Sequence, residues 1–564
     1  MTESRALADL VGALVQLREG LDAVPLGLDG TDVDTARRTR TKVVGQLEDY
    51  VLPRLLQIDA PLLAVVGGST GAGKSTLVNS LVRAPVSPVG VIRPTTHCPV
   101  VVHHPDDGYW FEGDRVLPNL ARTTKRNGGP AAVQLVPCDQ VPRGLALLDA
   151  PNVDSVDRAN RELAEEILSA ADLWLFVTSA ARYADLVPWE VLGEAARRST
   201  AVAVILDRTD PEDVTEVRGH LLRMMAARGL RDSPLFVVPE GRLDPDGLLT
   251  LGAVAAIRNW LDDLAGDQTG RDSIVEQSLI GTLRTVVYSS HEVADVAHEQ
   301  AAASERLRQV ADAAVADARA AAVAALGDGQ LVRGEIVTRW RELVDSGDGE
   351  RWARGRGRGA SVRRLLRGAV GGRLGPGERL EHAITDTLVA HVLEAVNTAH
   401  DGGSEAWSGD GAATGLLDQD TMAQGRLSRE RRGRVESAVT DWQATVGKAV
   451  AGVDRVVHPR DDSGELQAGL TTLAQLSALS ISAADEPAAS IASQAAEWLG
   501  EAIGTGALPL VEAARDDLAD TVREALDAER DRRRGLLEHA GTTFDAAEHI
   551  RDAARTVDDL RPVP

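Results

Sequence analysis

One segment of the sequence combines glycine, lysine and serine in a spacing that binds phosphate. Residues 68–75 read GSTGAGKS, which matches G-x-x-x-x-G-K-[ST] between an apolar run and an amphipathic stretch. The backbone N–H groups of such a loop, with the amino end of the next helix, can cradle phosphate oxygens. Lys74 would bridge the outer phosphates, and Ser75 would ligate Mg²⁺. The expected nucleotide contacts are Gly68, Ser69, Thr70, Gly71, Ala72, Gly73, Lys74, Ser75 and Thr76.

Two further segments could supply the magnesium side of this site. The run LLDAPN ends an apolar stretch in Asp149, a carboxylate that could hold a magnesium-bound water, unless the strand ends in Asp by chance. Asn152 stands where D-x-x-G GTPases have glycine, and its backbone N–H could still sense the γ-phosphate. Thr95 or Thr96 could ligate Mg²⁺ and close over that phosphate, or PTT could be an ordinary turn. The expected catalytic residues are Lys74, Ser75, Thr95, Thr96 and Asp149, with Ser75, Thr96 and Asp149 as metal ligands.

A third segment carries residues that could select the base. The run ILDRTD puts Asp207, Arg208 and Asp210 where GTPases carry [NT]-K-x-D. The carboxylate of Asp210 can accept the paired N1–H and N2–H donors of guanine, which adenine lacks, so GTP and GDP are the predicted ligands. Asp207 and Arg208 depart from the pattern, and helix capping by these carboxylates is the alternative. Glu240 is too weak a match to assign to the base.

The elements that must position these residues change along the chain. Six short apolar runs separated by helical stretches predict an α/β P-loop GTPase domain with a mostly parallel six-stranded sheet. The runs cover 62–67, 98–104, 144–151, 173–179, 201–207 and 233–239. Helices at 5–22 and 33–57 are expected before them, and beyond about 266 the composition predicts helices only, including one helix of about 80 Å over 272–326. We therefore expect a helical pair at 1–57, a GTPase domain at 58–265 and an all-α bundle or stalk at 266–564.

Composition limits the function classes. The 564 residues carry a net charge of -24, which disfavours a dedicated nucleic-acid binder. Two cysteines, Cys98 and Cys138, fit a reducing compartment. The sequence shows neither a signal-peptide pattern nor an apolar window of membrane-spanning length, which predicts a cytoplasmic protein that meets a membrane only from its surface.

Two segments of the helical half could contact a membrane. Residues 351–373 hold eight arginines and no acid, so they could attract anionic headgroups while Trp352, Leu365, Leu366 and Val370 insert. The alternative is a loop that pairs with acidic helices of the same molecule or of its dimer mate. Residues 470–494 are apolar enough to insert, or they form buried core.

The segments GGSTGAGKSTLVNSL, IRPTTHCP, LLDAPNVDS, ARYADLVPWEVL and LDRTD resemble the GTPase domains of dynamin-like proteins, especially bacterial ones, and more loosely Era-type and YfjP-type GTPases. The resemblance covers about residues 58–240. It implies Mg²⁺-dependent GTP hydrolysis, homodimerisation through the GTPase faces, a stalk movement at the inner face of a membrane, and terminal helices paired in a neck. A hetero-oligomer with a second dynamin-like protein is also implied. Dynamins carry glutamine where Thr70 stands, which implies slow hydrolysis or another water-positioning residue.

Two other classes of function stay open at this point. One is a soluble regulatory GTPase that acts on a protein or ribosomal partner, although the acidic helical half speaks against RNA binding. The other is a helical scaffold that binds nucleotide without turnover, which Thr70, Asn152 and Asp207 favour.

Overall fold

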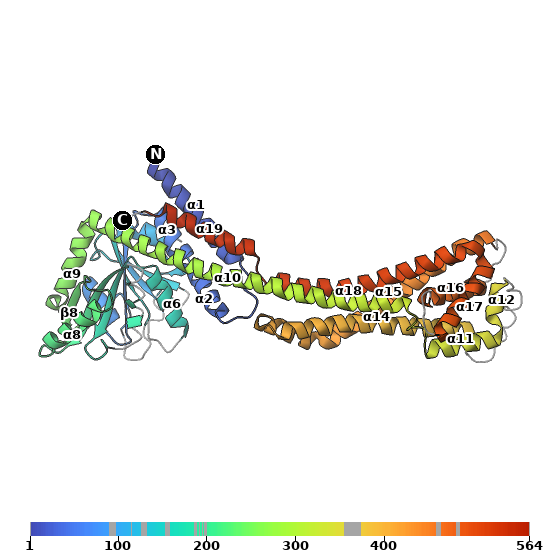
Figure 1. Ribbon diagram of the computed structural model, residues 1–564. Coiled ribbons are helices and arrows are strands. Elements are labelled where there is room, and N and C mark those ends of the chain that lie inside the picture. Colours follow the sequence, from blue (N-terminus) through green and yellow to red (C-terminus); the bar gives the residue numbers. More distant parts are fainter. Residues whose placement is uncertain are drawn as a thin grey trace. The chain divides into compact units, whose positions relative to one another are not determined.

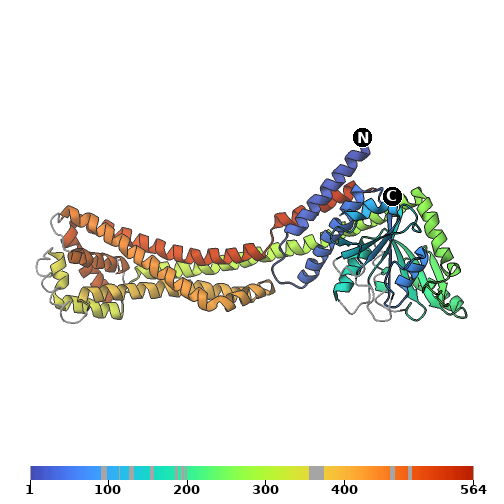
Figure 2. The ribbon, with the colours of Figure 1, turned by 180° about the vertical axis from the view of Figure 1, so that it is seen from behind.

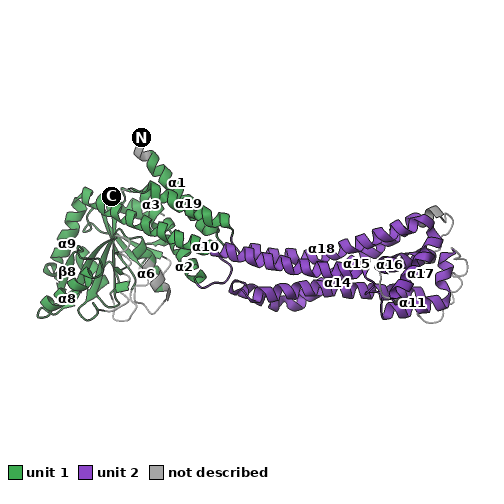
Figure 3. Ribbon diagram, in the orientation of Figure 1, with its two compact units in different colours: residues 1–25, 32–298, 543–564 green, residues 26–31, 299–542 purple. Residues whose placement is uncertain are grey.

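The computed structural model describes residues 2–89, 98–113, 115–125, 132–152, 158–184, 189–190, 192–193, 196, 200–354, 374–457, 464–480 and 486–562. The chain forms two compact units (Figure 3). Unit 1 comprises residues 1–25, 32–298 and 543–564, and unit 2 comprises residues 26–31 and 299–542.

Unit 1 is built on an eight-stranded sheet in the order β3-β4-β2-β5-β1-β6-β7-β8. Its strands are β1 (Leu62–Gly68), β2 (Val100–His103), β3 (Ala121–Thr123), β4 (Ala132–Pro137), β5 (Leu145–Asp149), β6 (Leu173–Ser179), β7 (Ala201–Thr209) and β8 (Leu235–Pro239). Only β2 and β5 pair in antiparallel fashion. The α/β class and the mostly parallel sheet are confirmed, but the predicted six strands were too few. The sequence missed β3, which has three residues, and β4, whose apolar run is interrupted by Gln134.

Helices cover both faces of this sheet, as buried parallel strands require. Leu62, Ala64 and Val66 of β1 share a core with residues of α4 (Lys74–Val82) and α9 (Leu251–Gly266). Gly67 points to the other face, where it lies against Leu168 of α6 (Arg158–Ser169). The described helices between β2 and β8 also include η2 (Pro105–Asp107), α5 (Gly108–Glu112) and α8 (Val214–Ala226). Strand β1 is buried along its whole length, which fixes the loop that follows it.

The first helices of the chain also belong to unit 1. They are α1 (Thr2–Ala23), α2 (Val33–Gln46), a π-helical turn η1 (Leu47–Val51) and α3 (Leu52–Leu56). The predicted helix over 33–57 is therefore present but is interrupted by the π turn. Helix α1 packs against α19 (Phe544–Leu560), so the two ends of the chain meet within this unit (Figure 1).

A buried aspartate ties these helices to the sheet. Asp172 precedes β6; its Oδ2 accepts the backbone N–H of Leu63 at 2.9 Å, and its Oδ1 lies 3.2 Å from Nε of Arg54. The hydroxyl of Tyr50 donates to Oδ1 at 3.2 Å and lies 3.0 Å from Oγ of Ser278. Ser278 lies in α10 (Gln268–Gly327), so the carboxylate of Asp172 and the hydroxyl of Tyr50 together connect η1, α3 and α10 to the sheet.

Helix α10 confirms the prediction of a single long helix. Its 60 residues span about 90 Å at 1.5 Å per residue. Unit 2 continues with α11 (Glu335–Ser346), α12 (Asp348–Ala353), α14 (Pro376–Ser408), η3 (Gly411–Ala413), α15 (Thr414–Val457), α16 (Gly464–Ser480), α17 (Glu486–Ile503), η4 (Gly504–Gly506) and α18 (Ala507–Ala540). Figures 1 and 2 show α14, α15 and α18 side by side, with the shorter helices gathered at one end of the unit. The predicted helical half is thus confirmed.

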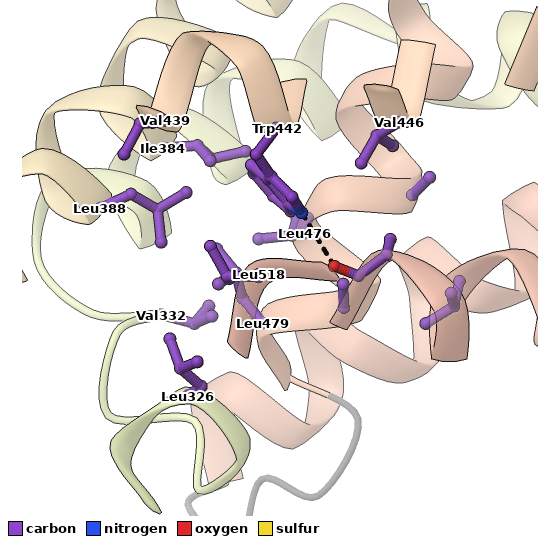
Figure 4. Packing of buried hydrophobic residues seen from close by; sticks show 14 of the residues in the cluster. Leu326, Val332, Ile384, Leu388, Val439, Trp442, Val446, Leu476, Leu479 and Leu518 are labelled. Atoms are coloured by element: carbon purple, nitrogen blue, oxygen red, sulfur yellow. Dashed lines mark hydrogen bonds between the residues drawn. The ribbon is translucent and has the colours of Figure 1, made fainter. Parts of the chain in front are cut away.

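The core of unit 2 follows the apolar stripes of its helices. Trp442 of α15 lies among Ile384, Leu388 and Leu518, and its Nε1–H donates to the carbonyl oxygen of Ala514 at 2.8 Å (Figure 4). Within the segment 470–494, the apolar side chains of α16 belong to this core, namely Leu470, Leu473, Leu476 and Leu479. Core burial, rather than membrane insertion, is therefore the correct interpretation of that helix.

The structure also places the first residues of the predicted basic segment. Trp352 packs against Gly377 and Gly469, where an added Cβ would come within 2.8 and 2.4 Å of the indole, so this side chain is not presented for insertion. Arg351 pairs with Asp348 at 2.6 Å. Residues 355–373, including Leu365, Leu366 and Val370, lie outside the described residues. Among the described helices, none is long and apolar enough to cross a membrane.

Candidate nucleotide-binding site

The phosphate loop turns sharply because it contains glycine where other residues cannot fit. Gly68, Gly71 and Gly73 have φ values of 140°, 78° and 97°. A Cβ on Gly68 would lie 2.0 Å from the carbonyl oxygen of Val177, and one on Gly73 would lie 2.1 Å from Oδ2 of Asp207. The loop is therefore pressed against the carboxyl ends of β6 and β7, and helix α4 starts directly after it.

Lys74 is the first residue of α4, and its side chain folds back over the loop. Its Nζ donates to the carbonyl oxygens of Gly68 at 3.0 Å and Ser69 at 3.1 Å, and to Oδ1 of Asn152 at 2.5 Å. Only 6% of Lys74 is exposed. The sequence assigned Asn152 a role through its backbone, whereas the structure places its side chain on the lysine.

Asp149 lies at the same edge of the sheet, because β5 pairs with β1 and Asp149 is in register with Val66. Its Oδ2 accepts the hydroxyl of Ser75 at 2.6 Å and also the hydroxyl of Ser87. Oδ1 is buried and has no hydrogen-bond partner in the described part of the chain. Burial raises the pKa of Asp149, while the two hydroxyls and the charge of Lys74 oppose that rise.

These residues fit a magnesium ion. Mg²⁺ prefers oxygen ligands. Oδ1 of Asp149 is buried, lies next to a serine hydroxyl and has no partner in the part of the chain that the structure describes, and such an ion would satisfy it. Ser75 and Asp149 would hold the ion, which would neutralise charge on the nucleotide phosphates. Thr95 and Thr96 were also expected to ligate Mg²⁺ or to close over the γ-phosphate. Both lie outside the described residues.

The predicted base-selecting residues follow the end of β7. Asp207 is buried beside the phosphate loop, and its Oδ1 accepts the N–H of Arg208 at 2.9 Å. Burial raises the pKa of Asp207 to about 6, with this hydrogen bond and the charge of Arg208 acting in the opposite direction. Arg208 has a φ of 52°. Asp210 is exposed, and its Oδ1 accepts the N–H of Glu212 at 3.1 Å. This local contact is of the kind expected if the carboxylate caps the following turn, which was the alternative to base selection.

The structure therefore brings Gly68, Lys74, Ser75, Asp149 and Asp207 together at one sheet edge. The rest of the predicted loop follows the same path: Ser69 and Ala72 are buried, Thr70 and Gly71 form the turn, and Thr76 lies in the first turn of α4. Sequence reasoning missed Ser87 and Asn79. Neither residue is part of the G-x-x-x-x-G-K-[ST] pattern, and a lone serine after a helix gives no local signal.

The sheet and the glycine-rich loop together define a P-loop nucleotide-binding domain of the GTPase type. Residues 63–125 match the model of the Dynamin family. This match lies within the GTPase domain and confirms that the motifs of that domain resemble those of dynamin-like proteins.

Solved structures show distant similarity over more of the chain. Two chains from structures described as an oligomerised bacterial dynamin pair, with a mechanism for long-range sensing and tethering of membranes, cover 93% and 97% of this chain and 95% of their own. Both are 9% identical, with TM-scores of 0.38 and 0.36. Toc33 from Arabidopsis thaliana, in complex with Mg²⁺ and GMPPNP, covers 44% of this chain and 97% of its own at 17% identity and a TM-score of 0.23. No match is found among curated proteins.

Proposed function

We propose that this GTPase binds and hydrolyses GTP with Mg²⁺, and couples the cycle to dimerisation and to membrane remodelling or assembly at a bacterial membrane. The observation that carries the nucleotide part is the convergence of the glycine turn, Lys74 and the Ser75–Asp149 pair at one sheet edge. These residue types in this order bind the phosphates of a nucleotide and its metal ion.

The surroundings of the glycine turn, Lys74 and the Ser75–Asp149 pair support a separate role for each in nucleotide binding. The glycine turn and the amino end of α4 direct backbone N–H groups at phosphate oxygens. Nζ of Lys74 donates to the neutral oxygens of Gly68, Ser69 and Asn152, and a phosphate oxygen can replace the carboxamide oxygen of Asn152. Ser75 and Asp149, which are hydrogen-bonded to each other, would bind the Mg²⁺ ion. Catalysis here is mainly positioning and charge stabilisation.

Guanine selection is assigned to Asp210. It follows β7, and Asp207 of that strand touches the phosphate loop, so a base bound beyond the phosphates would reach the exposed carboxylate of Asp210. The proposed ligands are therefore GTP and GDP.

The assembly part of the proposal rests on the family match and the long helices of unit 2. We propose a homodimer through the GTPase faces, with a second dynamin-like protein as an alternative partner. The eight arginines of 351–373 would attract an anionic surface at the inner face of the membrane. Because salt screens charge, added salt should weaken the binding of the protein to anionic liposomes.

The deciding experiment is Mg²⁺-dependent phosphate release from GTP and ATP in parallel, with and without anionic liposomes. We expect selective turnover of GTP, a higher rate with liposomes, and loss of turnover in Lys74→Ala. Asp210→Ala should lose the preference for GTP. Lys448→Ala and Asp213→Ala are matched controls, because both residues are exposed and lie outside the site.

The outcomes separate the three classes of function. GTP turnover without any liposome effect under any nucleotide state would leave a soluble regulatory GTPase. Binding of GTP without turnover above Lys74→Ala would mean a nucleotide-regulated scaffold. Equal handling of GTP and ATP would overturn the assignment of Asp210.

A further inference from the structure

Ser87 is fixed by an unusual double hydrogen bond. The side chain of Asn79, on α4, donates from Nδ2 to the carbonyl oxygen of Ser87 and accepts the N–H of Ser87 at Oδ1, both at 2.8 Å. Asn79 and Ser87 are 3% and 4% exposed. One carboxamide thus satisfies both backbone groups of a residue eight positions later, in the loop that follows the helix.

The hydroxyl that this clamp holds points at the metal side of the site. Oγ of Ser87 donates to Oδ2 of Asp149, the same oxygen that accepts Ser75. The two hydroxyls therefore occupy one carboxylate oxygen, and among the described residues the buried Oδ1 has no partner. Rotation of the carboxylate would break both hydrogen bonds, so this arrangement determines which oxygen of Asp149 is available.

We propose that Ser87, held by Asn79, is a positioning residue that orients the Asp149 carboxylate for the magnesium ion of the bound nucleotide. The proposal rests on the proposed function, because it concerns the same site. Loss of an outer hydrogen-bond partner of a metal ligand commonly lowers metal affinity by about 10–100-fold. A hydroxyl is needed here because it can donate to a carboxylate, which only accepts hydrogen bonds.

A purely structural role for Ser87 predicts something different. Its hydroxyl would then contribute about 0.5–1.5 kcal/mol to folding stability, as a typical hydrogen bond does. Loss of the hydroxyl would change nucleotide affinity equally with and without Mg²⁺. Positioning predicts instead an effect that depends on Mg²⁺.

The test measures the affinity of the full chain for fluorescently labelled GDP as a function of Mg²⁺ concentration, and again in EDTA. For Ser87→Ala we expect that the Mg²⁺ concentration giving half of the Mg²⁺-dependent increase in GDP affinity rises about 10-fold. The affinity for GDP in EDTA should be unchanged. Ser87→Thr keeps the hydroxyl and should restore the response. Asn79→Ala keeps Ser87 but removes its clamp, so a smaller shift in the same direction is expected.

Ser290→Ala is the matched control. Ser290 is also fully buried in unit 1, and its hydroxyl donates to the carbonyl oxygen of Val286 within α10, away from the site. Equal Mg²⁺ responses of Ser87→Ala and wild type, or an equal loss of affinity with and without Mg²⁺, would overturn the positioning role. If wild type bound no guanine nucleotide at all, the proposed function itself would fail, which is a separate and recognisable result.

Discussion

Two buried aspartates at opposite edges of one sheet have opposite hydrogen-bonding patterns. Asp172, at the amino edge, is 2% exposed; its two oxygens accept a backbone N–H and a tyrosine hydroxyl, and Oδ1 forms an ion pair with Arg54. Asp149, at the carboxyl edge, is 0% exposed, and one of its oxygens is left without a hydrogen bond within the described chain. A buried oxygen without a partner costs free energy unless a ligand satisfies it.

The difference separates a structural residue from a ligand-binding one. Asp172 joins the N-terminal helices, α10 and the sheet, and its satisfied carboxylate leaves nothing for a ligand to bind. Asp149 accepts the hydroxyls of Ser75 and Ser87 at Oδ2, but its Oδ1 has no hydrogen-bond partner among the described residues and can bind a cation. The comparison predicts that loss of Asp172 lowers stability, whereas loss of Asp149 lowers function.

The largest expected effect comes from Asp172. Asp172→Ala leaves the buried Arg54 without its carboxylate, and breaking a buried pair in this way costs about 3–5 kcal/mol. Chemical denaturation of unit 1, followed by circular dichroism, measures this. The double variant Asp172→Asn, Arg54→Met should lose less than Asp172→Asn alone, because no unpaired charge is left; a larger loss would contradict the structural role.

Asp149→Asn should act on turnover instead. Loss of a carboxylate at a magnesium site removes several kcal/mol of charge stabilisation, so GTP hydrolysis should fall by at least roughly 100-fold. The unfolding free energy should change by less than about 1 kcal/mol, since the variant also removes the burial cost of the charge. Phosphate release and denaturation on the same preparation test both parts. A variant that unfolds as readily as Asp172→Ala would erase the distinction between the two aspartates.

Tyr50→Phe tests the structural role of Asp172 at the amino edge of the sheet more finely. The variant removes only the hydroxyl that bonds to Asp172 and Ser278, so a loss of about 1–2 kcal/mol in unfolding free energy is expected. Turnover should stay at the wild-type level. Tyr288→Phe is the control, because Tyr288 is 66% exposed and its hydroxyl should contribute almost nothing.

The smallest effect is expected from Asp207, the second aspartate of the carboxyl edge. With a pKa of about 6, Asp207 gains negative charge beside the phosphate loop as pH rises through 6, so nucleotide affinity should fall over that range. The folded state also holds a proton that the unfolded state releases above about pH 4, so this group lowers stability between pH 4 and 6 as pH rises.

Replacing Asp207 by Asn tests this expectation. Asp207→Asn should raise GDP affinity about fivefold at pH 7.5, equivalent to about 1 kcal/mol, and remove the pH dependence near 6. Titrations at pH 5 and 7.5 measure both. Weaker binding by the variant at pH 7.5 would show that the charged carboxylate supports the loop rather than opposing the ligand.

Much of the site could be predicted because its signals are local. The loop 68–75 is a contiguous pattern, and Asp149 and Asp207 each end an apolar run. The sheet was predicted with too few strands because β3 is short and β4 is interrupted by a polar residue. The sequence left insertion of Trp352 into a membrane open, because it does not show that Gly377 and Gly469 lie against the indole.

The sequence by itself determined the phosphate loop, the α/β domain and the long helix α10, because glycine spacing and apolar periodicity act over a few neighbouring residues. Only the tertiary structure decided which buried aspartate is satisfied and which is not. The partners of Asp172 include Tyr50, and those of Asp149 include Ser87, at separations of 122 and 62 residues. Hydrogen bonds over such distances leave no local pattern, since chain folding alone brings the two groups together.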